Sequence, residues 1–351
     1  MRRPPVTTSA SPPAQPPSRI TINEVAARAG VAISTVSRVL NNGQVSSATR
    51  AAVEAAVEEL NYRPNAGARA LASGPKGAIG IIIPFATHHS AAERVRGALE
   101  TMADYDDELI LCDVGNGAQR DAYLGARAPL DRVDGLMIVS LTPTDREVES
   151  ITQAGVSTVL LDARHARLPH FLIDNVLGGA MAAEHLIALG HERLAFIGDA
   201  PSPQLGFSSS DDRWIGFSDA ARRHGLDESQ VICRTARHGR SAAQDLTKEL
   251  LSLPTRPTAI FAASDLQALG VLEAASEIGV RIPEDLSVIG FDDIEVAQYV
   301  GLTTVSQPLQ ESGRRGIERL FNLIAGRDTG ELEEMLPLTL LPRRTTAPPR
   351  S

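Results

Sequence analysis

Residues 21 to 41 carry an apolar and polar pattern that predicts two short helices joined by a turn. Thr21 and Glu24 have the spacing of a capping box at the start of the first helix, and Gly30 can adopt the left-handed conformation that ends it. The apolar face of the first helix is made of Ile22, Val25, Ala26 and Ala29. The inward face of the second helix is made of Val36, Val39 and Leu40. On shape alone, this pattern fits a DNA-reading helix-turn-helix and an ordinary pair of surface helices about equally well.

A third helix is predicted from about Ala48 to Leu60, with Ser46 or Ser47 as its N-cap. Its inward face is expected to consist of Ala52, Val53, Ala56, Val57 and Leu60. This helix closes a three-helix headpiece over residues 20–62. Composition alone favours a linker over residues 63–76. A helix of about eight residues containing Gly67 in this segment would be too short to be stable alone in water. The first 19 residues hold six prolines and no apolar stretch, which predicts a disordered arm and not a signal peptide.

From Lys76 the pattern changes to short apolar runs that alternate with helical stretches. The predicted strands are Ile79–Ile83, Gly135–Val139, Thr158–Leu161, Leu194–Ile197, Thr258–Ala262, Ser287–Phe291 and Thr304–Gln307. The predicted helices include Ala92–Met102, Gly178–Leu189, Asp212–Arg223, Ser241–Leu251, Leu266–Ile278 and Gln310–Ile324. Continuous apolar strands between helices predict parallel sheets covered on both faces, and the segment is long enough for two such α/β lobes.

Charge is distributed unevenly along the chain. The net charge is −9, yet residues 1–75 carry eight Arg, no Lys and four Glu, which leaves +4 on the N-terminal part and −13 on the remainder. A basic module on an acidic body favours phosphate contact at one end only. No run of about 18 uncharged apolar residues is present, so we expect no transmembrane span. Cys112 and Cys233 are the only cysteines, and we expect both to be reduced packing residues in a cytoplasmic protein.

The sequence of residues 21–41 resembles that of the LacI/GalR family of bacterial transcription regulators. The headpiece motif of this family is approximately T-(I/L)-x-(D/E)-V-A-x-x-A-G-V-S-x-x-T-V-S-R-V-L-N. The resemblance continues to about residue 349. It implies an all-α headpiece followed by an α/β, periplasmic-binding-protein-like core of two parallel-sheet lobes over residues 77–347. It also implies chain crossings between the lobes near 162, 292 and 307, a homodimer or higher oligomer, and a hinge helix within residues 63–76 that forms on DNA.

The expected DNA partner is a near-palindromic double-stranded operator. Arg38 can bond a guanine edge bidentately, and Ile33 can make only apolar contact, for example with a thymine methyl group. Leu71 matches the family's leucine that is wedged into the minor groove at the operator centre. The full set of predicted DNA-binding residues is Thr21, Ile33, Ser34, Thr35, Ser37, Arg38, Asn41, Asn65 and Leu71.

Polar residues at the carboxyl ends of the predicted strands are candidates for a ligand site, because ligands of open α/β sheets bind at that edge. Helix capping is the alternative role for any single Asp there. Arg213, in Arg-Trp-Ile-Gly-Phe, and Asp292 match effector positions of the family. The predicted effector-binding residues are His88, Asp162, Arg213, Ser264 and Asp292. The expected effector is a sugar or an acidic or phosphorylated metabolite, since stacking aromatics are not evident in the sequence and cations are frequent.

Two other classes of function are alternatives to a ligand-controlled repressor. A solute-binding protein would need a signal peptide or lipid anchor and would leave residues 21–72 without a role. An α/β enzyme would need a Gly-rich phosphate loop, a G-x-S-x-G elbow or a metal-spaced set of ligands. None of these motifs is found, so we expect no catalytic residues, no metal and no cofactor. Adjacent His88 and His89 lack an acidic or Cys partner in sequence and are read as loop residues.

Overall fold

The computed structural model describes residues 21–40, 44–60, 62, 76–125, 127–202, 204–328 and 330–350. The chain divides into two compact units, Met1–Gly74 and Pro75–Ser351, and each is described by itself. The predicted N-terminal arm, residues 63–75 of the predicted hinge segment, and the predicted DNA contacts Asn41, Asn65 and Leu71 lie outside the described residues.

The first unit contains three helices, α1 (Ile22–Ala29), α2 (Ile33–Leu40) and α3 (Ser47–Glu59). At the start of α1, the Glu24 carboxylate accepts hydrogen bonds from the Thr21 N–H (2.6 Å) and hydroxyl (2.9 Å). Gly30 ends α1 with φ 67°. The core of the unit consists of Val25, Ala26, Val36, Val39, Val53, Ala56 and Tyr62. Ala52 is exposed, contrary to prediction, because α3 buries only its Val53 and Ala56 positions.

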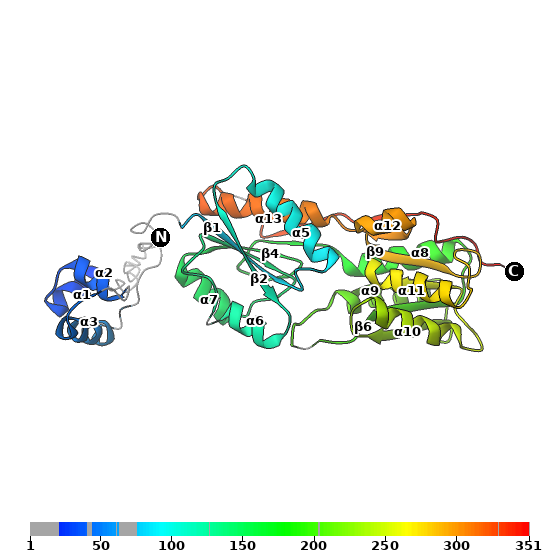
Figure 1. Cartoon of the computed structure of the whole chain (residues 1–351), viewed down its shortest axis with the longest axis horizontal. Helices are drawn as coiled ribbons and strands as arrows, with labels where there is room; N and C mark the ends of the chain where they lie inside the picture. Colours follow the sequence, from blue (N-terminus) through cyan, green and yellow to red (C-terminus); the bar gives the residue numbers. More distant parts are fainter. Residues whose placement is uncertain are drawn as a thin grey trace, which may run out of the picture. The chain divides into compact units, whose positions relative to one another are not determined.

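The second unit consists of two lobes, each built on a six-stranded sheet (Figure 1). The first sheet has the order β11-β5-β4-β3-β1-β2, and all its pairings are parallel. Its strands are β1 (Ala78–Pro84), β2 (Glu108–Val114), β3 (Gly135–Val139), β4 (Ser157–Leu161), β5 (His170–Leu172) and β11 (Glu333–Met335). Its helices are α5 (His89–Met102), α6 (Gly117–Leu124), α7 (Asp145–Ala154) and α13 (Leu309–Ile324).

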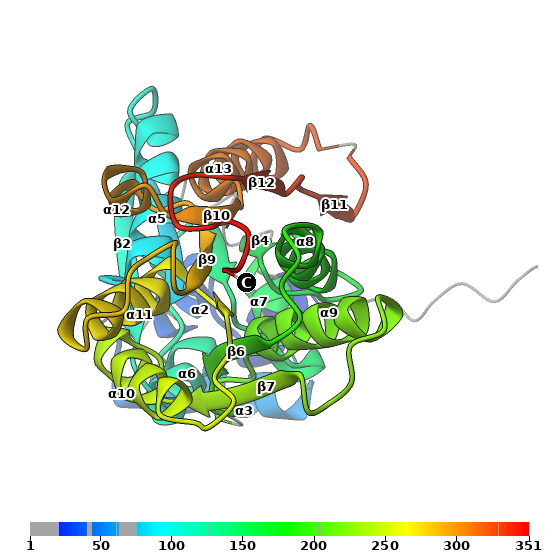
Figure 2. The ribbon, with the colours of Figure 1, turned by 90° about the vertical axis from the view of Figure 1, so that its right-hand side faces the viewer.

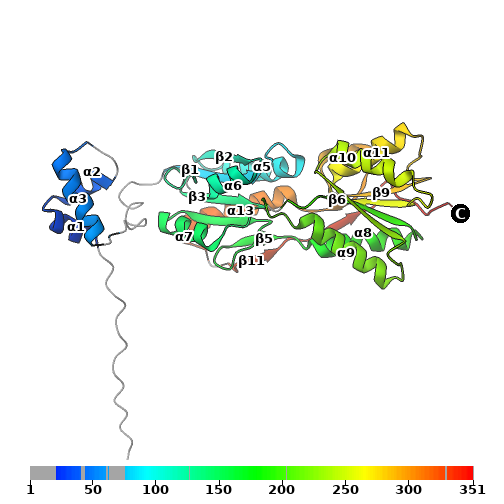
Figure 3. The same cartoon turned by 90° about the horizontal axis from the view of Figure 1, so that it is seen from below.

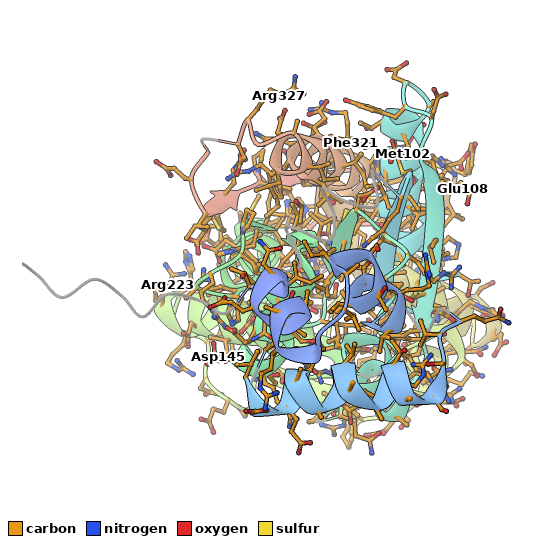
Figure 4. The ribbon with its side chains drawn as sticks, turned by 90° about the vertical axis from the view of Figure 1, so that its left-hand side faces the viewer. Met102, Glu108, Asp145, Arg223, Phe321 and Arg327 are labelled. Atoms are coloured by element: carbon orange, nitrogen blue, oxygen red, sulfur yellow. The ribbon has the colours of Figure 1, made fainter. Side chains whose placement is uncertain are left out.

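Apolar side chains on the two faces of the first sheet belong to separate clusters. Ile79, Ile81 and Ile83 of β1 pack with residues of α5 and α13, whereas Ile82 packs with residues of α6 and α7. Met102 near the end of α5 and Phe321 near the end of α13 lie together in the first of these clusters (Figure 4). The alternation along one strand therefore explains why its sequence is continuously apolar.

The second sheet has the order β12-β10-β9-β8-β6-β7, with β12 antiparallel to β10 and the other pairs parallel. Its strands are β6 (Leu194–Asp199), β7 (Val231–Ala236), β8 (Ala259–Ala262), β9 (Ser287–Asp292), β10 (Thr303–Ser306) and β12 (Thr339–Leu341). Its helices are α8 (Asn175–Ala188), α9 (Ser209–Arg223), α10 (Arg240–Leu251), α11 (Asp265–Glu277) and α12 (Glu295–Val300). Helices α8 and α9 cover one face, and α10 and α11 cover the other (Figures 2 and 3).

The chain passes between the lobes after β5, after β10 and between β11 and β12, that is near residues 173–174, 307–308 and 336–338. The predicted crossing near 162 is wrong, because β5 follows β4 in the same sheet. The predicted crossing near 292 is also wrong, because β9 is followed by α12 and β10 within the second lobe. The three-residue strands β5, β11 and β12 are too short for a sequence pattern to reveal. The fold class itself is confirmed: a three-helix headpiece precedes a core of two parallel-sheet lobes. Among the described residues, no helix is long and apolar enough to cross a membrane.

Candidate functional site

A cleft of about 750 Å³ lies between the two lobes of the core. The carboxyl ends of strands from both sheets reach it, which is where open α/β sheets bind ligands. All five predicted effector residues lie in its lining: His88, Asp162, Arg213, Ser264 and Asp292. Its size is within the range of small-molecule sites.

Arg213 projects from α9 of the second lobe into the cleft and is 7% exposed. Its Nε donates to Asn175 Oδ1 (2.8 Å), its Nη1 donates to the Ala263 carbonyl (2.5 Å), and the guanidinium lies 3.5 Å from the Phe291 ring centroid. Asp292 Oδ1 lies 3.9 Å from Arg213 Nη1. Burial lowers the pKa of Arg213, although the negative charge of Asp292 acts in the opposite direction. Burial likewise raises the pKa of the Asp292 carboxyl, although the positive charge of Arg213 opposes this. The pair is therefore a desolvated charge pair with little access to water.

The first lobe supplies a second buried cation and anion. Arg94 of α5 is 6% exposed, and its Nη2 lies 3.7 Å from Asp162 Oδ2. The Ser140 hydroxyl donates to the same carboxylate at 2.9 Å. The Nε of Arg94 is buried and has no hydrogen-bond partner among the described residues. A donor of this kind is costly to leave unpaired, so the site favours an additional acceptor beside Arg94.

Two close helix crossings place the two arginines. A Cβ atom on Gly313 of α13 would lie 1.9 Å from the Arg94 carbonyl oxygen, and a Cβ on Gly179 of α8 would lie 2.0 Å from that of Arg213. Only glycine allows the backbones to approach so closely. The helices α5 and α9 are thereby held against their neighbours at the turn that carries each arginine.

Gln307 connects the lobes at the passage between β10 and α13. Its side-chain amide donates to Asp292 Oδ1 (2.5 Å) and accepts from Arg94 Nη2 (3.2 Å), and the residue is 6% exposed. Arg94 belongs to the first lobe and Asp292 to the second. One neutral side chain thus joins the buried charges of both lobes.

Two imidazole rings also meet across the cleft. His88, which precedes α5, stacks on His238 of the second lobe with centroids 5.4 Å apart. His238 Nδ1 lies 3.0 Å from Asp199 Oδ1. Burial alone would lower the pKa of His238, but the hydrogen bond and charge of Asp199 raise it overall. Burial, and then the nearby His238, lower the pKa of His88. The stack therefore favours one charged and one neutral ring.

Backbone strain is concentrated at this cleft. Phe85, Ser140, Asp162 and Asp292 have φ of 50°, 52°, 54° and 119°, and all four line it. Non-glycine residues keep such conformations only where the surrounding structure fixes them, which is frequent at functional sites.

The aromatic content of the cleft corrects the sequence interpretation. Phe85 and Phe207 both line it, their ring centroids 6.4 Å apart, and Phe85 also stacks on His88 at 5.0 Å. Phe207 was missed because it lies in a Ser-rich stretch outside any predicted strand end. The expectation that the cleft is short of stacking surface is therefore wrong.

Ser264 both caps a helix and lines the cleft, the two roles open to residues at strand ends. It precedes α11, and its hydroxyl accepts from the Gln267 N–H (3.3 Å) and donates to Gln267 Oε1 (2.9 Å). It lines the cleft as well. The hydroxyl is largely used by the helix cap, so its remaining capacity for a ligand is small.

Several residues of the cleft were not predicted from the sequence, among them Arg94, Asp199 and Gln307. Arg94 lies on the apolar stripe of α5 between buried Ala91 and Ala98, and a charge on an inward face was the available signal. Asp199 is the last residue of β6, so its position at the carboxyl end of a strand was the available signal, as it was for Asp162 and Asp292.

In the headpiece, the outer face of α2 carries the predicted base-reading residues. Ile33 is 49% exposed, Ser34 and Arg38 are exposed, and Thr35 and Ser37 are half-buried. Within the described headpiece, Arg28 pairs with Glu59, whereas no ion pair joins Arg38 to a described residue. An exposed branched alkyl group beside an exposed guanidinium suits a base edge.

Comparisons with known proteins match both units. The family model for bacterial regulatory proteins of the lacI family matches residues 21–65, and that for a periplasmic binding protein-like domain matches residues 183–346. The ribose operon repressor of Escherichia coli (strain K12) is 36% identical over 311 residues, which cover 87% of this chain and 93% of the repressor. The HTH-type transcriptional repressor PurR of Vibrio atlanticus (strain LGP32) is 34% identical over 323 residues, with 88% and 93% covered.

Solved structures agree with these matches. A lac repressor dimer bound to operator and the anti-inducer ONPF has a TM-score of 0.67 at 28% identity and covers 94% of this chain and 100% of its own. A LacI family transcriptional regulator from Enterococcus faecium with bound ribose has a TM-score of 0.70 at 28% identity, with 77% and 99% covered. The chain belongs to the LacI family of bacterial regulatory proteins and is a DNA-binding transcriptional regulator.

Proposed function

We propose that this regulator is a homodimeric repressor whose operator affinity is controlled by an uncharged, hydroxyl-rich small molecule of the monosaccharide class. The observation that carries the proposal is a group of two arginines and two carboxylates that line the cleft, one pair from each lobe: Arg94, Asp162, Arg213 and Asp292. Guanidinium groups donate and carboxylates accept, so together they can bind hydroxyl groups, which do both. Because these charges balance, a charged ligand would leave one buried charge unpaired, which is costly.

The relatives support this ligand class. One is named a ribose operon repressor, and one neighbouring structure contains bound ribose. Phe85 supplies apolar surface for the face of a sugar ring that carries carbon-bound hydrogens. We infer that Arg213, Asp292 and Asp162 bond the ligand directly, with His88 and Ser264 beside them. A regulator of this kind acts by binding and not by catalysis, and we place it in the cytoplasm, where the DNA is.

A thermal-shift screen tests the ligand class. Full-length protein is heated with D-ribose, other neutral monosaccharides and ribose 5-phosphate. A neutral sugar at 100 times its Kd stabilises the core by about 2.7 kcal/mol. Arg213→Ala and Asp292→Asn lose this shift, while the matched control Arg222→Ala, an exposed arginine of the same helix, keeps it. If only the phosphorylated sugar stabilised the protein, the proposal of a neutral effector would be wrong and the effector would be an anion.

The sign of control is proposed to be induction, so that the ligand weakens operator binding. Fluorescence anisotropy on operator DNA, with and without the sugar, measures it. Arg213→Ala and Asp292→Asn should bind operator as the wild type does and lose the response. A variant that responds with unchanged sugar affinity removes its residue from the site, and tighter operator binding with sugar would make the ligand a co-repressor.

For the headpiece, we propose that two copies place α2 in successive major grooves of a near-palindromic operator. Arg38 bonds a guanine edge and Ile33 contacts a thymine methyl group; Thr21, Ser34, Thr35 and Ser37 make the surrounding contacts. Arg38→Ala should lose about 5- to 150-fold in specific affinity, the range of one bidentate base contact. Arg28→Ala, whose arginine is paired with Glu59, is the control. Equal binding by Arg38→Ala and wild type would refute the assignment. Asn41, Asn65 and Leu71 remain predictions that rest on the family resemblance.

A further inference from the structure

The loop between β6 and α9 of the second lobe extends to the first lobe (Figure 1). Residues 204–208 of this loop, here named the strap, contact the first lobe through apolar side chains. Leu205 is 7% exposed and belongs to the first lobe's hydrophobic cluster, which includes Val114 and Leu124. Phe207 packs against the same cluster and lies near Phe85. The strap is thus a non-covalent connection between the lobes.

The strap also approaches the first lobe closely at its first residue, Gln204. A Cβ atom on Gly117, the first residue of α6, would lie 2.9 Å from the Gln204 Cβ. The strap's base is fixed in the second lobe, because the Ser208 hydroxyl donates to Asp212 (2.9 Å). A segment anchored in one lobe and docked on the other resists any motion that separates them.

The same residues line the cleft. Leu205, Gly206, Phe207 and Ser208 are all part of its lining. In the described chain, the covalent passages between the two sheets lie at residues 173–174, 307–308 and 336–338. Covalent passages cannot release. The strap can, because its hold on the first lobe consists of side-chain packing alone in the contacts described above. Release of the strap from the first lobe would therefore change the lining of the cleft.

We propose that the strap is both the gate and the selectivity wall of the cleft, with Leu205 as the latch on the first lobe and Phe207 as the wall that limits ligand size. The inference rests on the proposed function, because it takes the effector to bind in this cleft. A compact sugar fits beneath the docked strap. A larger ligand extends to Phe207 and keeps the strap undocked, so it binds more weakly and leaves faster.

The latch is tested first without any ligand. Gly117→Cys and Gln204→Cys are combined in a Cys112→Ala/Cys233→Ala background, which removes the two native thiols. The two Cβ positions are close enough for a disulfide after a small shift. The pair should oxidise readily, and adding Leu205→Ala should slow the reaction about tenfold or more, since the burial of one leucine is lost. Gly117→Cys with Glu228→Cys, an exposed position of the second lobe, is the control pair. Failure to crosslink, or crosslinking unaffected by Leu205→Ala, overturns the latch.

The gate is tested with D-ribose and stopped-flow fluorescence of Trp214, the single tryptophan, which adjoins Arg213. The oxidised Gly117→Cys/Gln204→Cys protein should bind at least tenfold more slowly than the reduced form, and dithiothreitol should restore the rate. Equal rates overturn the gate. If the reduced protein and wild type do not bind D-ribose or any other neutral sugar, the proposed ligand class fails, while the ligand-free crosslinking still decides the latch.

The wall is tested by Phe207→Ala with D-ribose and the disaccharide cellobiose as probes. Removing the ring should raise cellobiose affinity relative to D-ribose affinity about tenfold or more, measured by calorimetry at one temperature. The same affinity ratio as the wild type, or binding of neither sugar, overturns the wall. The control Phe217→Leu changes an aromatic residue of the second lobe's core that does not line the cleft, and it should leave the ratio unchanged.

Discussion

Replacing Gln307 by methionine removes the amide that joins the lobes while keeping the length of the side chain. Gln307 is 6% exposed and makes two hydrogen bonds, to Asp292 Oδ1 (2.5 Å) and from Arg94 Nη2 (3.2 Å). A hydrogen bond to a charged group contributes about 1.5–3 kcal/mol, and a buried thioether recovers about 1–2 kcal/mol of apolar burial. We expect a net loss of about 2–4 kcal/mol in the free energy of unfolding of the core.

Differential scanning calorimetry of the full chain measures this loss. In a core of this size, 1 kcal/mol corresponds to about 2 °C, so Gln307→Met should lower the melting temperature of the core transition by about 4–8 °C. Gln298→Met is the control, because Gln298 is exposed on α12 and its replacement should cost less than about 0.5 kcal/mol. A melting temperature within 1 °C of wild type would refute the view that Gln307 connects the buried charges.

Gln307→Glu removes only the hydrogen-bond donor to Asp292, whereas Gln307→Met removes both the donor and the acceptor of the amide. It keeps an acceptor for Arg94 but puts a second carboxyl group next to Asp292. Two adjacent carboxyl groups share a proton at low pH and repel when both ionise. The destabilisation relative to wild type should therefore grow as the pH rises from 5 to 8. A destabilisation that is independent of pH in this range contradicts the placement of Asp292 beside residue 307.

Three further outcomes are expected. The stability contributed by the pair of His238 and Asp199 is fully present below the ordinary histidine pKa of about 6.5 and is lost as the pH rises through the raised pKa of His238, so the difference in melting temperature between wild type and His238→Gln should shrink from pH 6 to pH 9. Gly216→Ala should cost about 1–3 kcal/mol and weaken ligand binding in calorimetry, because the new Cβ would lie 1.8 Å from the Val176 carbonyl oxygen where α8 and α9 cross. Ala32→Ser should stabilise the isolated thermal transition of the headpiece by about 1 kcal/mol, because it adds an N-cap to α2.

The sequence was sufficient for the features that depend on local pattern. The capping box of Thr21 and Glu24, the turn at Gly30 and the alternation of apolar strands with helices are set by residues close together in the chain. The strand-end rule also selected residues that the structure places in one cleft, since parallel strands present their carboxyl ends at the same edge. Asp162 and Asp292 follow directly from that rule.

The sequence was insufficient where position depends on contacts between distant segments. Edge strand β2 was missed because five of its seven residues are exposed or partly exposed, so its pattern is mixed. The crossing near 162 was misplaced because β5, which follows β4 in the same sheet, is only three residues long. Its other partner strand is β11, where Glu333 lies opposite His170, 163 residues later in the chain. Arg94 and Gln307 meet only in the folded core, across 213 residues of chain, so no local pattern could pair them.

The buried charges also set how strongly a ligand can act on the core. A ligand shifts the equilibrium between two lobe arrangements only by its difference in affinity for them. A change from 1:99 to 99:1 requires about 5.5 kcal/mol of difference, or about 10⁴-fold. Hydrogen bonds to charged groups contribute about 1.5–3 kcal/mol each, so two to four bonds made in one arrangement only are enough. Arg94 and Asp162 offer such bonds from the first lobe, and Arg213 and Asp292 from the second. A ligand that bonds both pairs can therefore act as a switch, whereas one that bonds a single lobe binds both arrangements alike and shifts nothing.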